Sequence, residues 1–117
     1  LFHTGETKYT AEELRAILAD AARPVFVAEL SGQVVGYAFC VEKREHTPTL
    51  YLDDLCVDAA WRRHGVAAAL FDHVTAYAKQ KGFYSVTLNV WAGNESAQAF
   101  YESRGMTIQK TTMEKIV

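Results

Sequence analysis

Apolar positions in this chain follow helical spacing in some stretches and strand-like runs in others. Thr10 and Glu13 form a capping box that begins a helical apolar stripe of Leu14, Ile17, Leu18 and Ala21, and Pro24 ends this helix. Two further helices are predicted, from Gly65 to about Gln80 and from Asn94 to about Arg104. Strands are predicted at Val25–Leu30, Gln33–Val41, Leu50–Val57 and Tyr84–Trp91, with one or two terminal strands in Met106–Val117.

The connections between these elements predict how the strands pair. Ser31-Gly32 is a tight turn that joins the first two strands into a hairpin, and the first three strands are expected to be antiparallel. The third and fourth strands flank a helix, so they are expected to be parallel with a right-handed crossover. The sequence therefore predicts one α/β domain over residues 1–117, with a mixed, partly antiparallel sheet and helices on both faces.

Composition narrows the classes of partner. The 117 residues are 50% hydrophobic and 22% charged with a net charge of −2, which fits a soluble globular domain without a basic footprint for nucleic acid. No apolar run approaches the roughly 20 residues of a membrane span, and no signal peptide begins the chain. We therefore expect a cytoplasmic protein without nucleic-acid or membrane partners. The alternative is a targeting segment that has been removed, because the chain starts at Leu1 rather than methionine.

Cysteine and histidine positions argue against metal binding. Cys40 and Cys56 both lie in apolar runs, which predicts two reduced core thiols, with a disulfide or a catalytic thiol as the alternatives. The four histidines are scattered and show no metal-ligand spacing. We expect no metal.

The stretch from Tyr51 to Ala67 suggests an anion site. A buried strand leads through a polar loop into a helix that opens at Arg62-Arg63-His64-Gly65-Val66-Ala67. Unpaired N–H groups and the positive end of the helix dipole favour an anion there, and two arginines add charge. The pattern predicts a phosphate-bearing ligand held mostly by backbone, although Arg62 and Arg63 also fit a solvated surface pair.

Two segments resemble a known family. Arg62-x-x-Gly65-x-Ala67 is similar to the Gln/Arg-x-x-Gly-x-Gly/Ala signature of the GNAT acetyltransferase superfamily, where this loop cradles the pyrophosphate of acetyl-CoA. Asn94-Glu95-Ser96-Ala97-Gln98-Ala99-Phe100-Tyr101 is similar to the family's Asn-x-x-Ala-x-x-Phe-Tyr. The resemblance implies the GNAT fold and an N-acetyltransferase that uses acetyl-CoA. Family members usually carry a further strand and helix before the first helix seen here, and the resemblance implies that both are missing or replaced.

The resemblance also implies roles for individual residues. Tyr101 would be the general acid that protonates the CoA thiolate, and its alternative is a core tyrosine beside Phe100. Asn94 fits a CoA contact and an ordinary helix N-cap at the same time. The implied CoA-binding residues are Leu55, Cys56, Val57, Arg62, Arg63, His64, Gly65, Val66, Ala67, Asn94, Ala97 and Tyr101.

Strand alternation suggests a base. It places Tyr51, Asp53, Leu55 and Val57 on one face and Leu52, Asp54 and Cys56 on the other. By resemblance to polyamine acetyltransferases, Asp53 is the carboxylate that takes the amine's proton or binds a cationic acceptor. Asn89 aligns with another base position of the family, but an amide cannot serve.

The acceptor is expected to be an amine-bearing small molecule or peptide, and the resemblance admits a homodimer built through terminal strands. The main alternative function is a non-catalytic GNAT-fold domain that binds acyl-CoA or a protein partner. A nucleotide-hydrolysing domain is disfavoured, because no Gly-Lys-Ser/Thr follows the loop.

Overall fold

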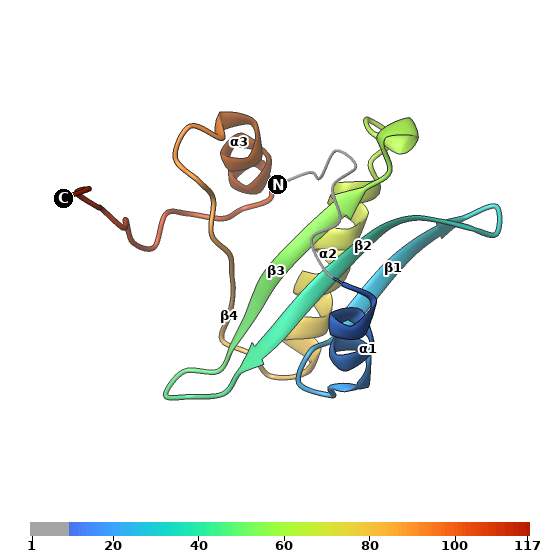
Figure 1. The fold of residues 1–117 in the computed structure, drawn as a ribbon, viewed down its shortest axis with the longest axis horizontal. Helices are drawn as coiled ribbons and strands as arrows, with labels where there is room; N and C mark the ends of the chain where they lie inside the picture. Colours follow the sequence, from blue (N-terminus) through green and yellow to red (C-terminus); the bar gives the residue numbers. More distant parts are fainter. Residues whose placement is uncertain (1–9) are drawn as a thin grey trace.

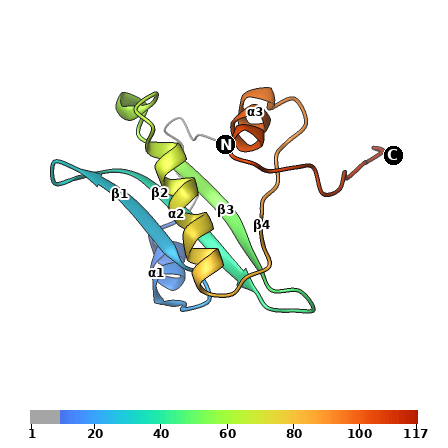
Figure 2. The same cartoon turned by 180° about the vertical axis from the view of Figure 1, so that it is seen from behind.

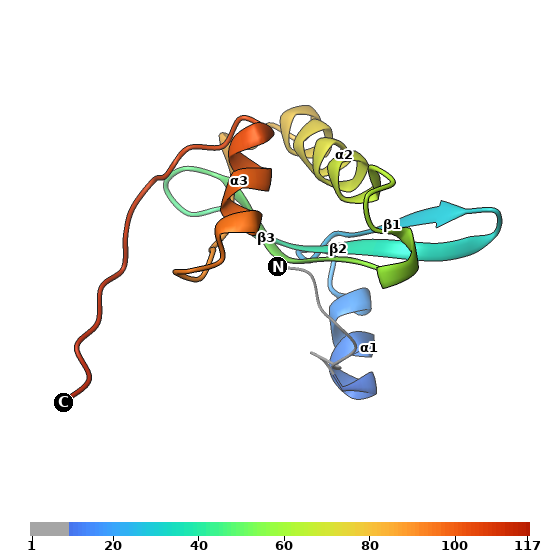
Figure 3. The ribbon, with the colours of Figure 1, turned by 90° about the horizontal axis from the view of Figure 1, so that it is seen from above.

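The computed structural model describes residues 10–117 and shows a mixed sheet between helices (Figure 1). Helix α1 lies on one face of the sheet and α2 on the other, as the rear and top views show (Figures 2 and 3). This arrangement confirms the predicted fold class. The elements are α1 (Ala11–Ala19), β1 (Val25–Leu30), β2 (Gln33–Lys43), β3 (Thr49–Val57), the short 3-10 helix η1 (Ala59–Trp61), α2 (Val66–Gln80), β4 (Ser85–Thr87) and α3 (Glu95–Ser103).

Strand pairing follows the predicted topology, with sheet order β1-β2-β3-β4. The first three strands are antiparallel, and β3 and β4 are parallel. At the β1–β2 turn, Ser31 and Gly32 both have positive φ, 53° and 77°, and so match the twist of a tight hairpin.

The main core lies between the sheet and α2. Its sheet residues come from β2 and β3, and α2 contributes side chains spaced along one face. Burial of these apolar side chains is the main favourable term for this fold. The core contains Val35, Ala38, Cys40, Leu50, Leu52, Leu55, Val57, Val66, Leu70, Phe71, Val74, Ala78, Phe83 and Tyr101.

Helix α1 is covered less completely than its apolar stripe predicted. The capping box is present: the Glu13 N–H donates to Thr10 Oγ1 at 3.1 Å, and the Thr10 N–H donates to Glu13 Oε1 at 3.3 Å. Ile17 is buried, but Leu18 is 66% exposed and Ala21 lies beyond the end of the helix. The face of the sheet on the α1 side is therefore more open than the face under α2.

Two strand predictions were wrong in the C-terminal half. The predicted strand Tyr84–Trp91 is reduced to Ser85–Thr87, because the chain leaves β3 after Thr87 and finds no further backbone partner there. Residues 106–117 form no strand. They run away from the sheet (Figure 1), and Ile108, Met113 and Ile116 are exposed. None of the helices in the described part of the chain is long and apolar enough to cross a membrane.

Candidate active site

The loop between β3 and α2 is held in an unusual backbone conformation. At its start the Asp58 N–H donates to the carbonyl of Val35 at 2.8 Å, and the Asp58 side chain accepts from the Ala60 N–H at 3.1 Å. Further along, Arg63 and Gly65 have positive φ, 64° and 76°. A non-glycine residue such as Arg63 is strained at this φ, and such strain is concentrated at ligand-binding sites.

The first turn of α2 carries the features of an anion site. Gly65 is its N-cap and provides no side-chain hydrogen bond, and no acidic residue lies in the first turn. The first N–H groups of a helix have no acceptor within the helix, so those that begin at Val66 remain available to a ligand. Arg62 is half-buried beside this turn, while Arg63 and His64 are exposed, with His64 Nδ1 2.9 Å from the Arg62 carbonyl oxygen. This donor set fits a phosphate group.

An open edge of β3 lies beside this loop. The ladder between β3 and β4 covers only three residue pairs and ends where Tyr51 faces Thr87. From Leu52 to Val57, β3 has no partner strand on that side within residues 10–117. Figure 1 shows the chain after β4 diverging from β3 on its way to α3. Backbone groups of the predicted contacts Leu55, Cys56 and Val57 therefore lie on a strand with one edge free of the sheet ladder.

A bulge in β3 overturns the simple alternation predicted for this strand. Phe39 of β2 faces Asp54 and Cys40 faces Leu52, so Asp53 is the extra residue of a bulge in the register between the two strands. The bulge reverses the direction of the side chains that follow it. Leu55 and Val57 consequently point into the same core as Leu50 and Leu52, not to the face of Tyr51 and Asp53. They can meet a ligand only through their backbone.

The two neighbouring carboxylates have different surroundings. Asp54 is 5% exposed, and the Tyr37 hydroxyl donates to its Oδ2 at 3.1 Å. Burial and the Asp54 charge raise the pKa of Tyr37. Asp53 is partly exposed. Burial and then the charge of Asp53 raise the pKa of the Cys40 thiol to about 12, and the same two causes raise the pKa of Tyr51. Sequence patterns did not single out Tyr37, since only the cross-strand register brings it to Asp54.

The two cysteines also differ. Both are free thiols, and Cys40 is buried in the core as predicted. Cys56 is only partly buried, because it faces Tyr37 across the β2–β3 ladder on the side away from α2. The prediction of a core thiol was therefore wrong for Cys56. No group of His, Cys, Asp and Glu in residues 10–117 is arranged to hold a metal ion.

Helix α3 presents Tyr101 towards the core. Asn94 caps the helix by accepting from the Ala97 N–H at 3.2 Å, and Ala97 and Tyr101 are buried on one face as their spacing predicted. The Tyr101 ring lies 5.4 Å from the Phe71 ring, centroid to centroid, and its hydroxyl is buried without a hydrogen-bond partner among the described residues. Burial and then the charge of Asp54 raise its pKa. Tyr101 is therefore a protonated donor at neutral pH.

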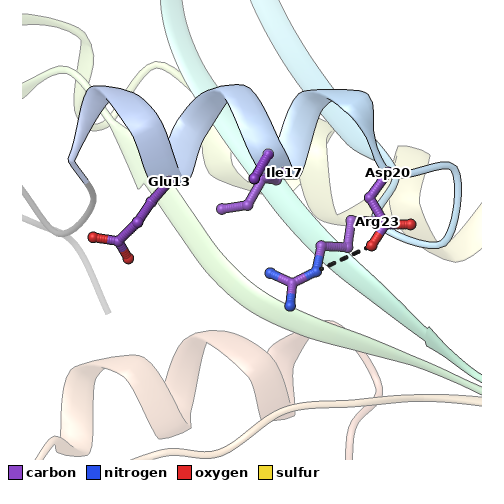
Figure 4. Close-up of a pocket in the computed structure, with 5 residues that line it drawn as sticks. Glu13, Ile17, Asp20 and Arg23 are labelled. Carbon is purple, nitrogen blue, oxygen red and sulfur yellow. Dashed lines mark ion pairs between the residues drawn. The ribbon is translucent and has the colours of Figure 1, made fainter.

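The hollow beside α1 is separate from these features. It has a volume of about 260 Å³ and contains the ion pair between Arg23 Nε and Asp20 Oδ2 at 3.6 Å (Figure 4). Its lining residues are Glu13, Ala16, Ile17, Asp20 and Arg23. None of these residues was predicted to bind CoA. The candidate site is therefore defined by the loop between β3 and α2 (residues 58–65, called the anion loop from here on), by the free edge of β3 and by Tyr101.

Comparison with known proteins identifies the family of the chain. The family model described as Acetyltransferase (GNAT) family matches residues 2–106. The chain belongs to the GNAT acetyltransferase family.

Two relatives illustrate the similarity in sequence. The chain is 34% identical over 94 residues to an uncharacterized N-acetyltransferase of Mycobacterium bovis, with 80% of this chain and 59% of the relative covered. It is 36% identical over 80 residues to the N-acetylaspartate synthetase of Danio rerio, with 68% of this chain and 28% of the relative covered. The chain thus spans from about a quarter to three-fifths of these two relatives.

Solved structures show the same fold. A mutant of a Bacillus halodurans protein matches with a TM-score of 0.86 and 27% identity, covering 100% of this chain and 80% of that one. An aminoglycoside N-acetyltransferase in complex with CoA matches with a TM-score of 0.77 and 19% identity, covering 88% of this chain and 72% of that one. The second likeness supports the fold alone.

Proposed function

We propose that this domain transfers an acetyl group from acetyl-CoA to a primary amine of a small molecule or peptide. The observation that carries the proposal is the uncapped start of α2 beside the free edge of β3, with Arg63 and Gly65 both in left-handed conformations. The loop would hold the pyrophosphate through backbone N–H groups, and the backbone of Leu55–Val57 would align the pantetheine arm and the acetyl oxygen. A relative named an uncharacterized N-acetyltransferase and another named N-acetylaspartate synthetase support this assignment.

The chemistry needs a base for the amine and a hydrogen-bond donor for the departing sulfur. The amine nitrogen attacks the thioester carbonyl, a C–N bond forms, and the C–S bond breaks with its electron pair on sulfur. Asp53 takes the proton that the nitrogen loses, directly or through a water, and the Tyr101 hydroxyl donates to the departing sulfur. The raised pKa keeps Tyr101 protonated but makes full transfer to a thiolate more costly, so its hydrogen bond is the important contribution.

The acceptor is an amine in this proposal because β3 presents one partly exposed carboxylate, Asp53, next in the chain to the buried Asp54. Asp53 is partly exposed, and Asp54 lies beside it with Tyr37. A cationic amine would be favoured near these carboxylates. One solved neighbour is an aminoglycoside acetyltransferase from a soil metagenomic sample, in complex with sisomicin, which supports an amine-bearing class without naming the acceptor of this chain.

A rival function shares the CoA site but lacks turnover. Leu18 of α1 and Val27 of β1 are exposed at 66% and 57%, and exposed apolar side chains of this kind would suit a protein partner. Acetyl-CoA binding without acetyl transfer to any amine or peptide in a broad screen would support this rival.

Direct binding tests the proposal first. We expect acetyl-CoA and free CoA to bind with similar affinity in calorimetric titrations, because the predicted contacts are with the shared phosphates and pantetheine. ATP should bind at least about tenfold more weakly, since it lacks the pantetheine arm. Absence of CoA binding would remove the enzyme assignment while leaving the fold intact.

The base assignment is tested by a matched pair of amide variants. Asp53→Asn should lower turnover roughly a hundredfold, because the amide cannot accept the amine's proton. Its stability should change little, because the side chain is partly exposed. Asp54→Asn should instead lower the free energy of unfolding by about 1–3 kcal/mol, because a weaker neutral oxygen replaces the charged acceptor of the Tyr37 hydroxyl and an amide NH2 group is buried in place of the second carboxylate oxygen. Turnover at saturating acetyl-CoA and thermal unfolding are measured for both variants. A normal turnover rate for Asp53→Asn would exclude Asp53 as the base.

A further inference from the structure

Gly36 lies where the sheet meets the start of α2. It is buried in β2 and faces Val57, the last residue of β3, across the ladder. The neighbouring Val35 accepts the hydrogen bond from Asp58 that begins the anion loop. Gly36 therefore lies beside the end of β3, where the loop to α2 begins.

Conformation does not explain this glycine. The glycines with positive φ in this chain are Gly32, Gly65, Gly82, Gly93 and Gly105, and Gly36 is not among them. Any residue could adopt its backbone angles. What Gly36 contributes is the lack of a side chain.

Space at Gly36 is filled from three directions. A Cβ placed there would lie 2.9 Å from the carbonyl oxygen of Cys56, 3.1 Å from Leu70 Cδ1 and 3.2 Å from Val66 Cγ1. The first contact is with backbone, which cannot rotate away. Val66 is the first residue of α2 and is β-branched, so its side chain has little freedom to move in the helix. An added methyl group must displace the helix start, the end of β3, or both.

We propose that Gly36 is a positioning residue for the CoA site, and that its missing side chain sets how deeply the first turn of α2 and the Cys56 carbonyl sit against β2. This inference rests on the proposed function, because Cys56 and Val66 are both predicted CoA contacts. Donors aimed at a phosphate lose much of their effect when they move by a fraction of an ångström to an ångström. Close packing transmits such a shift rather than absorbing it.

The test compares Gly36→Ala with Gly32→Ala. Gly32 has a φ of 77° and nothing within 4 Å of its Cβ position, so its alanine variant is strained in the β1–β2 turn without touching α2. In calorimetric titrations, we expect Gly36→Ala to bind CoA about tenfold or more weakly than the wild type, and Gly32→Ala to stay within about twofold. Thermal unfolding without ligand confirms that both variants are folded at the titration temperature.

A second readout separates positioning from a general loss of stability. S-acetylpantetheine lacks the nucleotide and the pyrophosphate, so it does not use the anion loop. Gly36→Ala should lose about tenfold in kcat/KM with acetyl-CoA and clearly less with S-acetylpantetheine. Equal losses with both donors, or CoA affinity equal to that of the wild type, would overturn the inference.

Two further outcomes are informative. If Gly36→Ala does not fold, the comparison moves to Gly36→Ala/Val66→Ala against Val66→Ala, in which the Val66 Cγ1 contact is absent but the Cys56 carbonyl contact remains. Weaker CoA binding by the double variant supports the inference, and equal binding overturns it. A wild-type protein that binds no CoA would instead reject the proposed function, before any variant is compared.

Discussion

Gly65→Glu is expected to abolish CoA binding. Gly65 has a φ of 76°, which a residue with a side chain adopts only with strain. The new carboxylate would also stand at the uncapped start of α2, where it would occupy the anion site and repel a phosphate. Strain and charge act together, so calorimetry should show a loss of at least about a hundredfold in CoA affinity.

Gly82→Glu is the matched control for this variant. Gly82 has a φ of 80° and open space around its Cβ position, and it lies just beyond the opposite end of α2. The substitution therefore adds the same charge and similar strain away from the loop. We expect CoA affinity within about twofold of the wild type. If Gly65→Glu binds CoA as well as Gly82→Glu does, the loop does not hold the phosphates.

Gly65→Ala separates the two causes. It keeps the strain at this φ but adds no charge. Its CoA affinity should fall between those of the wild type and Gly65→Glu if repulsion matters. Identical losses for both variants would assign the whole effect to backbone conformation.

Local rules explain why much of this molecule was predictable from its sequence. The capping box at Thr10 and Glu13 and the cap at Asn94 depend on residues three apart, and both form as expected. The parallel pairing of β3 and β4 follows from the helix between them. Ala97 and Tyr101 are four residues apart in α3, so helical spacing places both on one buried face, as predicted.

Features that depend on distant partners were not predictable. The bulge at Asp53 exists only in the register between β2 and β3, and a plain period of two put Leu55 and Val57 on the wrong face. Strand-like composition after Met106 likewise gave no strand, because a strand needs a neighbour as well as suitable residues.

Gly36 shows the same limit at a single residue. In the sequence it is one glycine within a predicted strand, and nothing nearby marks it. Its role comes from Cys56, Val66 and Leu70, which lie 20 or more residues away along the chain and surround the position that a Cβ would take. Steric constraints of this kind arise only when strand and helix pack together.

Tyr101→Phe is expected to lower turnover roughly a hundredfold or more while CoA affinity stays within about threefold of the wild type. The hydroxyl is buried and donates to no described residue, so in this proposal its acceptor is the CoA sulfur. Phenylalanine fills the same space against Phe71 but cannot donate. Turnover measured at saturating acetyl-CoA gives the rate, and calorimetric titration with CoA gives the affinity.

Tyr101→Phe should lower turnover but should not lower stability. A buried hydroxyl without a partner destabilises the folded state, so its removal should leave the free energy of unfolding unchanged or raise it by about 1 kcal/mol. Tyr84→Phe is the control, because Tyr84 is 80% exposed and should change neither rate nor stability. A Tyr101→Phe enzyme that turns over normally would remove the donor role. One that is slow and unstable would show that the tyrosine serves packing, whereas a slow and fully stable enzyme is the result expected of a group retained for catalysis.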